Sequence, residues 1–71
     1  MALATYSDQS PTDIRMGDVV QDAKGTYTAL SNAEADQWQQ VAVRAADGWH
    51  TYDPDIHRVT ITFDETPDMY A

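Results

Sequence analysis

The residues of this 71-residue chain that come closest to a metal site in type and spacing are Asp53, Asp55 and His57. In an extended segment alternate side chains point the same way, so two carboxylates and an imidazole would face one ion. The same segment is typical of a turn, because Pro54 sets φ and an aspartate bonds to its own backbone. A calcium loop needs glycine at its sixth position, where Arg58 stands. We therefore interpret it as a structural turn and predict no bound metal or cofactor, with a metal-dependent enzyme as the weakest alternative.

Nucleophilic catalysis is the other chemistry that the residue types suggest. His50 and His57 flank the turn, and three serines are nominal nucleophiles: Ser7, Ser10 and Ser31. A catalytic triad is recognised by its geometry, however, and no G-x-S-x-G motif, phosphate loop or dinucleotide fingerprint occurs. The absence of cysteine excludes thiol nucleophiles, disulfide scaffolds and cysteine-ligated zinc. A chain this short rarely encloses an active-site pocket alone, so we predict that it is not an enzyme.

The charge balance is the strongest compositional signal. Twelve Asp and Glu residues stand against four Lys and Arg residues, which gives a net charge of −8. Four bases cannot neutralise these acids, so most of the charge must be exposed, and direct binding to nucleic acid or an anionic membrane is not expected. Three explanations remain: solubility, adaptation to high salt, and complementarity to a basic protein surface, where carboxylates stand in for phosphates.

Two β-rich regions must position these groups. Residues 14–22 and 26–30 predict a hairpin around the turn Ala23-Lys24-Gly25. Residues 49–52 predict a short strand, and residues 57–63 alternate strictly between apolar and polar side chains, which predicts another strand. The flanking segments are expected to be loose, over about 1–13 and over the acidic tail 64–71.

The intervening segment predicts a helix. Ser31 and Glu34 fit a capping box, and Gly48 fits the glycine that ends a helix. At 100° per residue the apolar face comprises Trp38, Val41, Ala42 and Ala45. Trp38 would then lie in the core with Trp49 packed against the last turn. Val43 points to the polar side, so a strand over 41–43 is the alternative.

The order of these elements predicts a single α+β domain over residues 1–71. A small antiparallel sheet of ββαββ order would carry one helix, about 32–47, on one face. The alternative is an SH3-like small β-barrel of five short strands. No apolar run approaches the roughly 20 residues of a membrane helix, and the N-terminus lacks the features of a secretory signal, so a cytoplasmic location is expected.

In length, acidity, lack of cysteine and an expected α+β layout without a catalytic motif, the chain resembles small acidic phage-encoded inhibitors of host defence, the anti-CRISPR and anti-restriction type. The resemblance implies a non-enzymatic DNA mimic that occupies the basic surface of a nucleic-acid-binding defence protein in the host cytoplasm. It carries no residue signature. From the predicted elements we expect the partner-binding residues to be Asp36, Asp47, Asp53 and Asp55.

The alternative function is a small structural or adaptor module of a larger assembly, of the virion or toxin–antitoxin type. Its contacts would run through apolar groups such as Val43, Met69 and Tyr70, with little dependence on salt. The acidity would then reflect solubility or high-salt adaptation. A homodimer is also compatible with either function.

Overall fold

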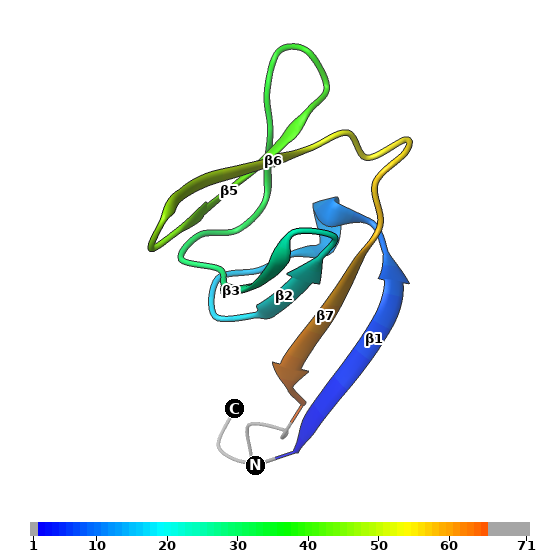
Figure 1. The fold of residues 1–71 in the computed structure, drawn as a ribbon, viewed down its shortest axis with the longest axis vertical. Helices are drawn as coiled ribbons and strands as arrows, with labels where there is room; N and C mark the ends of the chain where they lie inside the picture. Colours follow the sequence, from blue (N-terminus) through cyan, green and yellow to red (C-terminus); the bar gives the residue numbers. More distant parts are fainter. Residues whose placement is uncertain (1, 66–71) are drawn as a thin grey trace, which may run out of the picture.

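A computed structural model describes residues 2–65 and shows two antiparallel sheets (Figure 1). Sheet A has the order β1 (Leu3–Gln9), β7 (Val59–Asp64), β2 (Val19–Asp22) and β3 (Gly25–Thr28). Sheet B has the order β4 (Glu34–Ala35), β5 (Val41–Ala45) and β6 (Gly48–Tyr52). Within residues 2–65 the helical content is a single 3₁₀ turn, η1 (Pro11–Asp13).

The predicted hairpin is confirmed as β2 and β3. Val20 pairs with Tyr27, and Asp22 pairs with Gly25 at the turn. The Asp22 carboxylate closes this turn, because its Oδ1 accepts hydrogen bonds from the backbone N–H groups of Lys24 (2.8 Å) and Gly25 (3.1 Å). The strands predicted over 49–52 and 57–63 are also confirmed, as β6 and β7.

The predicted helix over about 32–47 is wrong, because this segment forms β4, a loop and β5. Buried and exposed side chains alternate along β5, with Val41, Val43 and Ala45 inward. This period of two is the strand pattern, and β-branched valines favour it. The presumed capping residues act differently: Ser31 Oγ accepts a hydrogen bond from the backbone N–H of Arg44 (3.1 Å).

The residue that was expected to end the helix instead belongs to a hairpin. Gly48 has φ of +123°, in a region that favours glycine, and it follows directly on the two-residue connection between β5 and β6. The α+β class is therefore replaced by an all-β arrangement. The barrel alternative was closer in its absence of a helix, but seven strands in two sheets replace the five strands that it expected.

The N-terminal segment expected to be loose contains β1. This strand lies antiparallel to β7, with Leu3 opposite Asp64 and Tyr6 opposite Ile61. The register shifts between Tyr6 and Gln9, where Asp8 has φ of +57°. A shift of this kind is a β-bulge, and it marks the end of regular pairing at the edge of sheet A. Of the predicted acidic tail, residues 66–71 lie outside the described residues.

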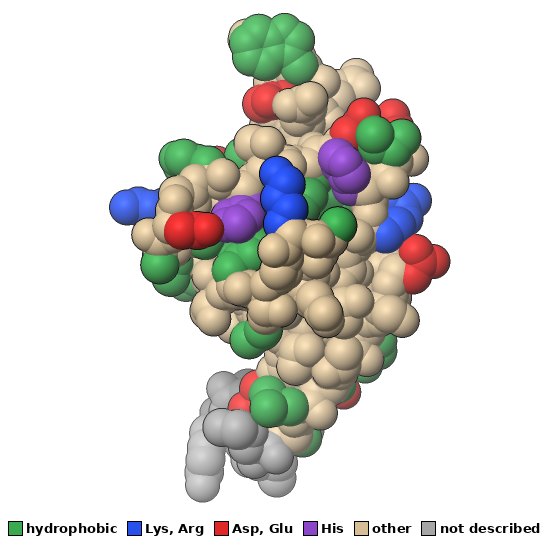
Figure 2. All heavy atoms as spheres, in the orientation of Figure 1, with side chains coloured by type: hydrophobic (Ala, Val, Ile, Leu, Met, Phe, Trp, Pro, Cys, Tyr) green, Lys and Arg blue, Asp and Glu red, His purple; other side chains and the backbone are tan. Residues whose placement is uncertain are grey.

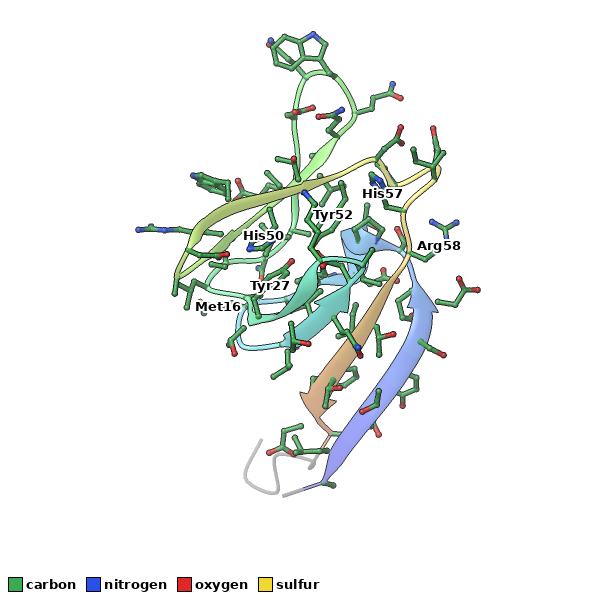
Figure 3. All side chains as sticks on the ribbon, viewed as in Figure 1. Met16, Tyr27, His50, Tyr52, His57 and Arg58 are labelled. Carbon is green, nitrogen blue, oxygen red and sulfur yellow. The ribbon has the colours of Figure 1, made fainter. Side chains whose placement is uncertain are left out.

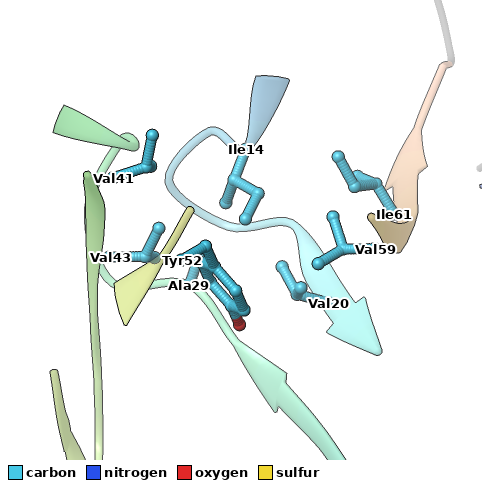
Figure 4. Close-up of a cluster of buried hydrophobic side chains, with 8 residues drawn as sticks. All are labelled: Ile14, Val20, Ala29, Val41, Val43, Tyr52, Val59 and Ile61. Atoms are coloured by element: carbon cyan, nitrogen blue, oxygen red, sulfur yellow. The ribbon is translucent and has the colours of Figure 1, made fainter. Parts of the chain in front are cut away.

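The hydrophobic core lies between the two sheets (Figure 4). Sheet A contributes Val20, Val59 and Ile61; sheet B contributes Val41, Val43 and Tyr52; and the connecting segments contribute Ile14 and Ala29. The core is small, and most of its members are aliphatic. Nearly all the aromatic rings therefore lie at its margin or on the surface, which positions them for the features described next.

Candidate functional site

A cleft of about 410 Å³ opens where the β2–β3 turn faces β6. Its lining residues come from that turn, from β6 and from the loops on either side of β6: Asp22, Ala23, Lys24, Asp47, Trp49, His50, Thr51, Tyr52, His57 and Arg58. Its volume lies in the range of small-molecule sites. Figure 3 shows Tyr27, His50 and Tyr52 gathered between β3 and β6, with His57 and Arg58 on the following loop.

Hydroxyl hydrogen bonds connect two of the lining residues, Tyr52 and Asp22, to each other and to Tyr27. The Tyr52 hydroxyl donates to Asp22 Oδ2 at 2.7 Å, and its oxygen lies 2.7 Å from the Tyr27 hydroxyl. Because Tyr52 has one hydroxyl hydrogen, which goes to Asp22, the Tyr27 hydroxyl must donate to Tyr52. Tyr27 therefore donates to Tyr52, and Tyr52 donates to Asp22. These hydrogen bonds join sheet B to sheet A.

Burial and these hydrogen bonds together determine the charges of Tyr52 and Asp22 at neutral pH. Burial raises the pKa of Tyr52 far above its ordinary value, and the hydrogen bond that Tyr52 donates to Asp22 raises it further. Burial also raises the pKa of Asp22, but hydrogen bonds from Tyr52 and from two backbone N–H groups outweigh it, so the pKa lies below its ordinary value. Tyr52 is therefore a neutral donor and Asp22 a charged acceptor.

His50 closes one side of the cleft. Its ring stacks on Tyr27 with a centroid separation of 3.9 Å and an interplanar angle of 13°. Its Nε2 lies 2.9 Å from Asp47 Oδ1, and a carboxylate accepts, so Nε2 carries the hydrogen. This hydrogen bond lowers the pKa of the Asp47 carboxyl. Asp47, which was expected to bind a partner, therefore also holds the His50 ring in place.

The segment that resembled a metal site forms a hydrogen-bonded turn. His57 Nδ1 accepts from the Asp53 backbone N–H at 2.7 Å, and Asp53 Oδ1 accepts from the Asp55 backbone N–H at 3.0 Å. The backbone N–H of His57 donates to the Asp53 carbonyl at 2.8 Å. Within residues 2–65 no group of three His, Asp or Glu side chains is placed to hold a metal ion.

The second feature is an exposed tryptophan on a fixed loop. Trp38 is 73% exposed, in the loop between β4 and β5 that projects from sheet B (Figure 1). Asp36 Oδ1 accepts from the backbone N–H groups of Trp38 (2.8 Å) and Gln40 (2.9 Å). The Asp36 backbone N–H donates to the Gln40 carbonyl at 2.7 Å. The Asp36 carboxylate therefore builds the loop that presents Trp38.

Trp49 is also exposed, at 64%, on β6 opposite Arg44. The expectation that both tryptophans belong to the core is wrong, because it depended on the helix. In β5 and β6 the inward positions are taken by Val43 and His50, which pair with each other, so their neighbour Trp49 points to the other side. Val43, expected as an apolar contact, is fully buried, whereas Met69 and Tyr70 lie outside the described residues.

The structure brings together three of the four expected partner-binding acids. The loop that contains Asp36 and the loop that contains Asp53 and Asp55 leave sheet B at the same end, because Val41 pairs with Tyr52. Asp47 lies in the β5–β6 turn at the opposite end. Most of these carboxylates also stabilise their own loops, which is a structural role that charge counting does not reveal.

Several residues of the cleft were given no functional role from the sequence, although Asp47, His50 and His57 had been considered for other roles. Tyr52 and Asp22 were assigned only to a strand and to a turn, and Lys24 only to the turn residues. Their proximity results from the packing of sheet B on sheet A, which no local pattern encodes. Comparison with protein-family models, with curated proteins and with solved structures finds no match for this chain. No helix within residues 2–65 is long and apolar enough to cross a membrane.

Proposed function

We propose that this chain is a non-catalytic adaptor module that binds a protein partner through exposed tryptophans, with Trp38 on the loop that projects from sheet B as the principal contact. The observation that carries the proposal is Trp38, which is 73% exposed on a loop held by the Asp36 carboxylate. Tryptophan is enriched among the residues that dominate binding energies at protein interfaces. A loop already fixed before binding loses less conformational entropy when the partner docks.

An exposed tryptophan offers apolar surface that binding can bury. A tryptophan that buries about 150 Å² of apolar area gains roughly 3–4 kcal/mol at about 25 cal/mol per Å². The core of this chain is small and lacks both tryptophans, so Trp38 and Trp49 together retain a large amount of unburied apolar surface. A partner with an apolar pocket supplies that burial.

The acids beside the tryptophans describe the partner further. Each exposed tryptophan follows an aspartate by two residues, in Asp36-Gln37-Trp38 and in Asp47-Gly48-Trp49. Interfaces commonly place an apolar anchor inside a polar rim. We therefore propose a partner that has an apolar pocket with a basic rim. The rim charges set the association rate more than the affinity.

The test compares capture of partners from the cells that encode the chain by three tagged forms. Trp38→Ser is expected to lose a partner that the wild type retains in both 50 mM and 500 mM salt. Leu3→Ser is the matched control, because Leu3 is 66% exposed at the start of β1 and far from sheet B. Equal capture by Trp38→Ser and wild type contradicts the proposal.

Inhibition of a nucleic-acid-binding defence protein is the electrostatic alternative, and it predicts a different outcome of the same capture. A DNA mimic depends on summed charge, so its partner would dissociate in 500 mM salt whether or not Trp38 is present. Self-association is checked separately by sedimentation equilibrium of the purified chain. A dimer that dissociates on Trp38→Ser would make a second copy the partner.

A further inference from the structure

The cleft between the β2–β3 turn and β6 gathers most of the basic side chains of an acidic chain. Of the six Lys, Arg and His side chains in the sequence, four line it: Lys24, His50, His57 and Arg58. On the face drawn in Figure 2, a Lys or Arg side chain lies between the two His side chains. In a chain with a net charge of −8, this gathering of basic side chains distinguishes the cleft from the rest of the described surface.

The two carboxylates that line the same cleft, Asp22 and Asp47, equal Lys24 and Arg58 in number, but both already accept hydrogen bonds from other groups. Asp22 accepts from Tyr52 and from two backbone N–H groups, and Asp47 accepts from His50. Neither Lys24 nor Arg58 lies within salt-bridge distance of the Asp22 or Asp47 carboxylate. The Lys24 ammonium and the Arg58 guanidinium therefore remain available as donors in the cleft.

The basic side chains of the cleft offer hydrogen-bond donors to a ligand. Arg58 Nη1 donates to the Pro54 carbonyl at 2.7 Å and to the His57 carbonyl at 3.0 Å, which fixes the guanidinium on the loop and leaves its other N–H groups as donors. The neutral His57 ring accepts at Nδ1, so its hydrogen is on Nε2. Lys24 adds three donors. Ammonium and guanidinium groups complement phosphate and carboxylate oxygens.

We propose that this cleft binds the oxyanion group, phosphate or carboxylate, of a small molecule, with Lys24 as the principal charged contact and Arg58 at the rim. A cleft of about 410 Å³ exceeds what an inorganic anion needs, so the ligand carries an organic part. His50, whose ring stacks on Tyr27, lines the same cleft and offers that part an aromatic surface. The proposal does not depend on the adaptor function, because it uses neither Trp38 nor a protein partner.

The test is a titration of the ¹⁵N-labelled chain with inorganic phosphate, acetate, phenyl phosphate and benzoate at constant ionic strength, with chloride as the reference anion. We expect saturable changes in the NMR chemical shifts of the turn that contains Lys24 and of His50 and His57. The ring-bearing probes should bind several-fold more tightly than the bare anions. Whether phosphates or carboxylates bind more tightly identifies the oxyanion.

Lys24→Gln should weaken binding of the preferred probe about tenfold, the loss of one charge-assisted hydrogen bond. Arg15→Gln is the matched control, because Arg15 does not line this cleft. The substitution at position 24 keeps the turn, since that turn uses the backbone N–H of Lys24 and not its side chain. Absence of saturable shifts with all four probes, or equal weakening by Lys24→Gln and Arg15→Gln, overturns the proposal.

Discussion

The Tyr52 hydroxyl in β6 donates a 2.7 Å hydrogen bond to the Asp22 carboxylate at the end of β2. This bond connects the two sheets outside their aliphatic core, and Tyr27 extends it by donating to the same hydroxyl. The ring of Tyr52 also belongs to the core. One residue therefore packs with its ring and connects the sheets with its oxygen, which makes Tyr52 the most sensitive polar position of the cleft.

Tyr52→Phe is expected to destabilise the chain by about 1–3 kcal/mol, because Asp22 loses a donor and Tyr27 loses its acceptor in a part-buried region. Tyr27→Phe removes only the outer bond and should cost about 0.5–1.5 kcal/mol. Urea unfolding followed by circular dichroism measures both. Equal stabilities of Tyr52→Phe and wild type would show that the bond contributes nothing in solution.

The Asp22 carboxylate should make stability depend on pH. Its pKa is below the ordinary value in the folded chain, so its stabilising contribution is present above the unfolded-state pKa and is lost as pH falls through the folded-state value. The free energy of unfolding of wild type minus that of Asp22→Asn should therefore be largest near pH 7 and shrink below about pH 4. A difference that stays constant down to pH 2 contradicts this assignment.

The two tryptophans should report their own exposure. In Trp38→Phe and in Trp49→Phe, the remaining tryptophan is the only one in the chain. Its emission should already resemble that of the unfolded chain, and acrylamide quenching should increase little on unfolding in urea, because Trp38 and Trp49 are 73% and 64% exposed. Strong protection from acrylamide in the purified chain would indicate burial, either in the core or in a dimer.

The Asp36 carboxylate should control the loop of Trp38. Asp36→Ala removes the acceptor of two backbone N–H groups and is expected to cost about 0.5–2 kcal/mol, as loss of a helix cap does. Hydrogen exchange of the Trp38 and Gln40 amides should accelerate, whereas amides in β7 should change only with global stability. Asp55→Ala is a matched removal of charge on a neighbouring loop. If both variants accelerate the Trp38 amide equally, charge rather than the bond is responsible.

Core substitutions distinguish the observed strand from the helix that the sequence predicted. Val43→Ala should cost about 2 kcal/mol, because Val43 is fully buried and truncation leaves a cavity. Arg44→Ala, next along β5 and exposed, should change stability by less than about 0.5 kcal/mol. Thermal or urea unfolding measures both. The helix would place Val43 on its polar face, so a negligible effect of Val43→Ala would favour it.

Three of the four strands of sheet A, β2, β3 and β7, could be predicted because their sequence patterns are local, whereas β1 lies in the segment that was expected to be loose. Apolar and polar side chains alternate strictly along residues 59–63, and the β2–β3 turn contains the glycine that such turns favour. The segment 31–47 misled because alanine, glutamine and glutamate favour helices and its spacing allowed an apolar face. The segment instead forms a strand that pairs on both sides, because Val41 and Val43, with one residue between them, are both buried on the same face.

The cleft was beyond sequence reasoning for a different reason. Tyr27 and Asp22 lie 25 and 30 residues from Tyr52, and only the packing of the two sheets brings them together. The exposure of the two tryptophans was also not predicted, because an aromatic residue in a small chain is usually buried. The exposure of Trp49 depends on which face of sheet B turns inward, and Val41 and Val43 decide that, whereas Trp38 is exposed because it lies on a projecting loop.

The pairing of β1 with β7 also determines when the chain can fold. Sheet B is built from neighbours in sequence, but β7 is the inner strand that joins β1 to β2, and it pairs Leu3 with Asp64. Sheet A therefore cannot assemble until residue 64 has left the ribosome. Because such distant pairings are slow to close, folding on the order of milliseconds to seconds is expected. During synthesis β1 emerges first and waits unpaired, so its exposed edge is the segment of the nascent chain most in need of protection.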